Sequence, residues 1–149
     1  MKIDDLINDR KIIIFGENHS KPDDVDRIRE SIIKLDPDVI LHELYWEDEE
    51  FYNNNLEDAT VLPLENDVDI NSDDLKSQFM KREQSMIENL NDVLKNDNYD
   101  VIVVVVGDTH LRTIKTNELG NKSPLVEWAK DNNATIVRSP YNEIARGQQ

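Results

Sequence analysis

The chain has no cysteine. It can therefore form no disulfide framework and has no cysteine nucleophile, and any bound metal ion must be held by nitrogen and oxygen ligands. Long apolar runs are also missing, since no stretch approaches the roughly 18 consecutive apolar residues of a membrane span. The first five residues lack the basic-then-apolar pattern of a signal peptide. We therefore expect a soluble protein in the cytoplasm.

Basic residues are scarce. The chain has 17 lysines and arginines against 32 aspartates and glutamates, for a formal net charge of −15. Contact with phosphate needs clustered Lys and Arg, so nucleic acid and anionic membranes are disfavoured as partners. A small-molecule or peptide substrate is expected instead, with a homodimer left open. A length of 149 residues predicts a single domain over residues 1–149.

Apolar runs alternate with helical patterns along the chain. Short apolar runs predict β-strands at residues 11–15, 39–41, 61–64, 99–106 and 134–137. Helices are predicted at residues 20–35, 72–95 and 109–119, over the first part of 45–59, and from Ser123-Pro124 onward. This alternation predicts an α/β fold with a largely parallel central sheet of about five strands and helices on both faces. The valine-rich run is expected at the sheet centre, and Pro63 places the third strand near an edge.

The only three histidines lie at or just after the ends of predicted strands, with acidic residues beside them. Loops after the strands of an open parallel sheet share one edge, where ligand sites usually form. The groups expected to converge at this edge are Glu17, His19, His42, Glu43, Glu65, Asp108 and His110. Two of the histidines close Gly-x-x-His turns that begin at Gly16 and Gly107, where a missing Cβ allows a sharp exit from the strand and a close backbone approach.

Histidines with carboxylates support two kinds of chemistry. They could bind a divalent metal ion that makes a bound water acidic enough to attack an acyl carbon. Alternatively, one histidine oriented by a glutamate could act as a general base on water without a metal. On the apolar face of the long predicted helix, Arg82 must meet a carboxylate or an anion. It could clamp Glu43, stabilise a developing oxyanion, or form a purely structural ion pair with Glu83.

Each of these residues also has a plainer interpretation. A single histidine after a strand is more often a cap or a satisfied polar residue, and Asp108 could simply cap the helix that follows it. The acidic run at residues 47–50 is interpreted as a solvated face. The set of three histidines is harder to explain in this way.

The motifs resemble one superfamily when they are taken in order. They are Gly16-Glu17-Asn18-His19, then Glu43, then Arg82 with Met86 four residues later, then Gly107-Asp108-Thr109-His110. This order is similar to the TraB and Tiki proteins, the ChaN-like proteins and the erythromycin esterases. The resemblance covers residues 11–138 and implies an erythromycin esterase-like or ChaN-like α/β fold.

The resemblance implies hydrolysis. Tiki proteins are metal-dependent proteases, erythromycin esterases hydrolyse a macrolactone, and ChaN-like proteins are linked to haem or iron. Carried onto this chain, it implies a metal-dependent hydrolase of amide or ester bonds, with His19, Glu43 and His110 binding manganese, cobalt, zinc or iron. Glu17 would then act as general base or orienting residue and Arg82 would stabilise the oxyanion or hold Glu43, whereas His42 has no clear counterpart.

A different class of function stays open. The chain is much shorter than the family members, so the helical insertions that would cover the site and select a substrate are expected to be missing. A non-catalytic module that binds haem, iron or a small ligand is the alternative, and a structural protein that reuses the fold is another.

Overall fold

The computed structural model describes residues 10–18, 21–43, 45–67, 69, 71 and 73–138. His19, one of the three predicted metal ligands, lies outside the described residues, as does Ser20, the predicted start of the first helix.

Five parallel strands form one sheet in the order β3-β2-β4-β1-β5. The strands are β1 (Lys11–Glu17), β2 (Val39–His42), β3 (Thr60–Pro63), β4 (Val101–Gly107) and β5 (Thr135–Val137). The α/β prediction is therefore confirmed. The valine-rich strand β4 lies at the centre, and β3, which contains Pro63, lies at an edge, as both features of the sequence predict.

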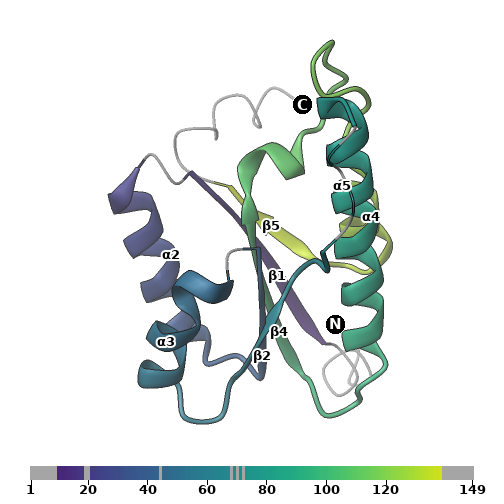
Figure 1. The fold of residues 1–149 in the computed structure, drawn as a ribbon. Helices are drawn as coiled ribbons and strands as arrows, with labels where there is room; N and C mark the ends of the chain where they lie inside the picture. Colours follow the sequence, from purple (N-terminus) through teal and green to yellow (C-terminus); the bar gives the residue numbers. More distant parts are fainter. Residues whose placement is uncertain are drawn as a thin grey trace.

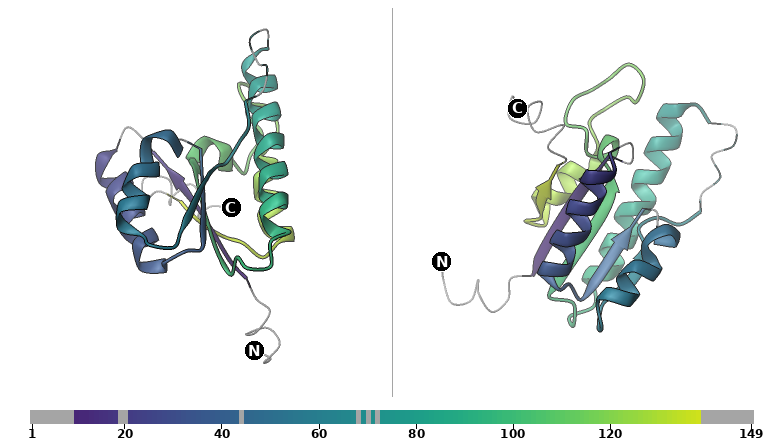
Figure 2. Two further views of the ribbon diagram at one scale, coloured as in Figure 1. Left: turned by 60° about the horizontal axis from the view of Figure 1, so that its bottom comes forward. Right: turned by 90° about the vertical axis from the view of Figure 1, so that its left-hand side faces the viewer.

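Helices cover both faces of the sheet (Figure 1). On one face lie α2 (Pro22–Leu35) and α3 (Tyr45–Asn55), and on the other lie α4 (Leu75–Leu94) and α5 (Pro124–Asp131). The left view of Figure 2 shows the sheet between these helix pairs, and the right view looks onto the face that α2 and α3 cover. Within the part of the chain that the structure describes, no helix is both long and apolar enough to cross a membrane.

The central strands are buried on both faces, which explains why their sequences show apolar runs rather than alternation. Alternate residues of β4 point to opposite sides: Val104 packs with Met86 and Leu90 on the α4 side, and Val103 packs with Ile32 on the α2 side. All five of these side chains are at most 1% exposed. The sheet is thus a rigid base for the groups that follow its strands.

The prediction of a helix at residues 109–119 is wrong. Only a single 3₁₀ turn, η1 (Asp108–Leu111), follows β4, and Arg112 is already extended with ψ of 140°. Further along, Thr116 and Gly120 exchange two backbone hydrogen bonds of 2.8 and 2.9 Å. The Thr116 hydroxyl also accepts from the Leu119 N–H at 2.9 Å, a local bond that competes with helix formation. Gly120, with φ of +79°, closes this turn instead of ending a helix.

Candidate functional site

Three of the predicted groups lie at one edge of the sheet, at the carboxyl ends of β1, β2 and β4. Glu17 is the last residue of β1 and pairs in register with Gly107 at the end of β4. Glu43, directly after β2, accepts a hydrogen bond of 2.6 Å at its Oε1 from the Gly107 N–H. His110 lies in η1, within 3.5 Å of the same glutamate. The expected common edge is therefore present for these residues.

Glu43 is the centre of this cluster. Its Oε2 accepts a hydrogen bond of 2.6 Å from Arg82 Nη2 and lies 3.5 Å from His110 Nε2. Burial by itself would raise the pKa of Glu43, but the interactions with His110, the Gly107 N–H and Arg82 outweigh it and lower the pKa to about 2. Glu43 is therefore a permanently ionised carboxylate at neutral pH.

Arg82 reaches this edge from α4 and joins two strand ends. Besides Glu43, it binds Glu65, which follows β3, through Nε and Nη2 at distances of 2.7 to 3.1 Å. Of the three roles considered for Arg82, the clamp on Glu43 is the one that the contacts match. The interpretation of Arg82 and Glu83 as an ion pair with each other is wrong, because Glu83 binds other partners.

His110 is held on both sides by glutamates. Its Nδ1 lies 2.8 Å from Glu83 Oε2, its Nε2 faces Glu43, and its ring stacks on Phe79 with centroids 4.6 Å apart. Burial by itself would lower the pKa of His110, but the interactions with the two glutamates outweigh it and raise the pKa. The imidazolium form is therefore favoured more strongly than in a free histidine.

Arg112 is a member of the site that the sequence did not suggest, and Glu83 was considered only as an ion-pair partner of Arg82. Glu83 is fully buried, and it accepts two hydrogen bonds from Arg112, at 2.6 and 3.0 Å, besides its contact with His110. The sequence contains one signal for Glu83: it is a charged residue on the apolar stripe of a helix, and such a residue must have a partner. The identity of that partner depends on the approach of η1 to α4.

Glu17 is a buried carboxyl group whose pKa is raised to about 7. It is only 3% exposed. Burial is the main cause that raises its pKa, from 4.5 to about 7, with His42 lowering the pKa and Asp48 and Glu43 raising it. A carboxyl group with a pKa near 7 can both accept and release a proton under physiological conditions.

A second charged cluster lies under α2 and α3. His42 is 1% exposed, and its Nε2 lies 2.8 Å from Asp48 Oδ2, while Asp48 also accepts from Arg29. The interpretation of residues 47–50 as a solvated face is therefore wrong at Asp48, which is 5% exposed, although Glu49 and Glu50 are exposed as expected. Opposite charges in two other elements explain why one acid of this run is buried.

Asp108 binds Arg138, which follows β5, through two hydrogen bonds of 3.0 and 2.6 Å. It does not cap η1, whose first turn has no side-chain cap. A Cβ on Gly16 would lie 2.5 Å from Asp108 Oδ1 and 2.9 Å from Leu111 Cδ1. The glycine of the first Gly-x-x-His turn is therefore required for the close approach of β1 to η1.

We next consider how well these donors suit the predicted metal ion. Of the three predicted ligands, His110 and Glu43 are described and lie together, whereas His19 is not among the described residues. Both oxygens of Glu43 already accept hydrogen bonds, and His110 is biased toward the protonated form, which cannot coordinate a metal. No group of three His, Asp or Glu residues suited to a metal ion occurs within the described ranges. The described donors by themselves therefore do not fit a metal site.

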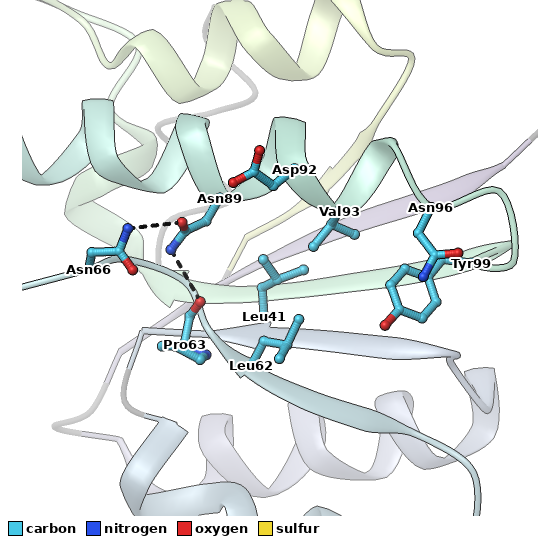
Figure 3. A pocket seen from close by; sticks show the side chains of 9 residues that line it. All are labelled: Leu41, Leu62, Pro63, Asn66, Asn89, Asp92, Val93, Asn96 and Tyr99. Carbon is cyan, nitrogen blue, oxygen red and sulfur yellow. Dashed lines mark hydrogen bonds between the residues drawn. The ribbon is translucent and has the colours of Figure 1, made fainter.

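A cavity of about 350 Å³ lies between α4 and the strands β2 and β3 (Figure 3). None of the predicted site residues lines it. Its two central amides are engaged by protein groups, since Asn66 donates to Asn89 at 3.2 Å and Asn89 donates to the Leu64 carbonyl at 3.0 Å. We therefore do not place the chemistry there.

No protein-family model, curated protein or solved structure matches this chain.

Proposed function

We propose that this protein is a hydrolase that cleaves an amide or ester bond at the carboxyl edge of its sheet. One observation carries the proposal. Two buried groups and one half-buried group at this edge have pKa values displaced from their ordinary values in different directions: Glu17 to about 7, the half-buried Glu43 to about 2, and His110 upward. Environments that separate the pKa values of neighbouring groups are typical of acid–base catalytic sites.

The roles follow from these protonation states. Glu17, whose pKa burial raises to about 7, takes a proton from the attacking water. His110, whose Nδ1 is engaged by Glu83 and whose pKa the two glutamates raise, uses its Nε2, 3.5 Å from Glu43, to donate a hydrogen bond to the carbonyl oxygen as negative charge develops on it. Arg82 acts indirectly by holding Glu43, and hence the orientation of His110. His19, two residues beyond Glu17 in the chain, is expected at the same edge and would add a second imidazole.

The resemblance to metal-dependent hydrolases makes a resident metal ion part of the test. If His19, His110 and Glu43 bind a divalent ion in solution, the ion would activate the water, and Glu17 would remain the proton acceptor. Binding would require His110 to lose a proton and Glu43 to change its contacts with Arg82.

The proposal is tested by incubating the purified protein with a panel of p-nitrophenyl esters and fluorogenic dipeptide amides. The assay is run with EDTA and, separately, with added manganese, cobalt or zinc. We expect turnover of at least one ester or amide that falls in the Glu17→Gln variant and persists in a Glu57→Gln control, since Glu57 is exposed on a loop. Activity that survives EDTA supports the metal-free scheme.

Elemental analysis of the wild-type and His19→Ala proteins separates the two schemes. Metal that is present in the first and absent in the second supports the metal-dependent version. Absence of turnover across the panel in every condition would contradict the hydrolase proposal. In that case, a Soret shift on titration with hemin would favour the alternative of a non-catalytic haem or iron module.

A further inference from the structure

A cavity with a volume of about 770 Å³ lies beside the proposed catalytic cluster. It is lined by η1, by the loop that replaces the predicted helix, by one side of α5 and by the residue after β5. Its volume is in the range of small-molecule sites, which are commonly about 300 to 1,000 Å³. The strands β4 and β5 end at this cavity, where open α/β sheets usually bind ligands.

The charge of the cavity is opposite to that of the protein. In a chain with 17 basic and 32 acidic residues, the described residues that line the cavity include four basic side chains and a single acidic one. The basic residues are Arg112, Lys122, Lys130 and Arg138, and they come from three separate segments of the chain. The acidic residue is Asp108. This local reversal favours an anionic ligand.

The arginines and the lysines differ in how they are held. Arg112 is bound to Glu83 and Arg138 to Asp108, each by a bidentate interaction that fixes its position. Lys122 and Lys130 share one carboxylate, that of Glu127, at 3.0 and 3.8 Å, and both lysine side chains are more than half exposed. One positive charge is therefore left over between the two lysines, and these side chains can turn toward a ligand.

The rest of the lining suits a molecule with an apolar part. Ile114, which is 65% exposed, contributes apolar surface together with Leu119 and Val126. The cavity also adjoins the catalytic cluster, because its wall residue Arg112 shares Glu83 with His110. A molecule bound in the cavity would thus lie next to the groups proposed to perform hydrolysis.

We infer that this cavity binds the anionic end of a small molecule, a carboxylate or phosphate on an otherwise apolar body, with Lys122 and Lys130 as its main charge partners. That this molecule is the substrate rests on the hydrolase function proposed above, whereas binding of the anion itself does not.

The binding step is tested with the fluorescent probe 8-anilinonaphthalene-1-sulfonate and its neutral analogue N-phenyl-1-naphthylamine. The wild-type protein should bind the sulfonate more tightly than the neutral analogue, and inorganic phosphate should compete. The double variant Lys122→Gln/Lys130→Gln should weaken sulfonate binding by about fivefold or more, the effect of losing two close charges near a protein surface. The matched control is Lys11→Gln/Lys34→Gln, two exposed lysines at the start of β1 and the end of α2, which should leave the affinity within about twofold.

Equal affinity for the two probes, or equal sulfonate affinity in wild type and Lys122→Gln/Lys130→Gln, would overturn the inference. The titration is repeated in Glu17→Gln protein, where hydrolysis is not expected. Sulfonate binding that persists in this variant supports the binding inference whether or not the hydrolase proposal holds. If turnover is found, esters that carry a carboxylate should show a lower KM than neutral esters. The lysine double variant should raise that KM by about fivefold and leave kcat unchanged.

Discussion

The Nδ1 atom of His110 lies 2.8 Å from Oε2 of Glu83, and this contact joins the turn after the central strand to the long helix α4. Glu83 is fully buried and is also held by Arg112. The orientation and charge of the histidine in the second Gly-x-x-His turn therefore depend on a residue outside that motif.

Replacing Glu83 with glutamine should lower the pKa of His110. The substitution removes one of the two negative charges that outweigh the effect of burial on this imidazole. The pKa is measured by NMR titration of the His110 ring protons. Glu57→Gln serves as the control because Glu57 is exposed. A His110 pKa that is unchanged in Glu83→Gln would show that Glu83 does not set the charge of this histidine.

Stability should fall between about pH 5 and pH 8 because of Glu17. Its folded-state pKa of about 7 lies above the unfolded value of 4.5, so the folded state binds the proton more tightly. Its stabilising contribution is complete below pH 4.5 and is lost as the pH rises through 7. One pKa unit corresponds to about 1.4 kcal/mol, so the loss amounts to roughly 3 kcal/mol.

Urea unfolding of wild type and Glu17→Gln at pH 5 and pH 8 measures this dependence. The variant should be more stable than wild type at pH 8, since its neutral amide carries no buried charge. The difference between the two proteins should be small at pH 5. A difference in unfolding free energy that does not change with pH would contradict the raised pKa of Glu17.

Two neighbouring acids in α3 should differ sharply in their effect on stability. Asp48→Ala removes the partner of buried His42 and of Arg29 and should cost about 3 kcal/mol. Glu49→Ala changes an exposed residue and should stay within about 0.5 kcal/mol. Thermal unfolding followed by circular dichroism compares the two variants. Equal losses would mean that the cluster of His42, Asp48 and Arg29 adds no stability.

Gly16→Ala changes the first Gly-x-x-His turn but should also disturb the structure of the second, which begins at Gly107. The added methyl group would meet Asp108 and Leu111, and Asp108 is fixed by Arg138. A cost of about 1 to 3 kcal/mol is expected from this overpacking. The NMR signals of His110 should shift as well, because η1 has to move. A variant as stable as wild type, with unshifted His110 signals, would show that the close approach is not required.

The strands and most helices could be predicted because they are encoded locally. Runs such as Val101–Gly107 are apolar on both faces, and Pro63 marks an edge by its missing N–H, so both could be assigned without knowledge of the tertiary structure. The helix prediction for the segment after η1 failed because no packed apolar face supports the helical pattern there. The hydrogen bonds of the turn at Thr116 and Gly120 are formed instead.

The site could be predicted only in part, for a related reason. Chain order and strand ends are enough to place Glu17, Glu43 and His110 at one edge. The partners of charged residues depend on contacts between elements 17 to 39 residues apart, as for Arg82 with Glu65 and Glu43. Spacing within one helix gives no information about such contacts. The same limit explains why the burial of Asp48 was missed.

The central claim is that Glu17 is the proton acceptor of a hydrolytic site, and its most direct test is the kcat/KM of Glu17→Gln against wild type at pH 8. The measurement uses the best ester or amide from the panel, in the metal condition that gives the highest wild-type rate. The account predicts a loss of about 100-fold or more, the usual contribution of a general base, with the Glu57→Gln control unchanged. A Glu17→Gln value within about threefold of wild type would contradict the account.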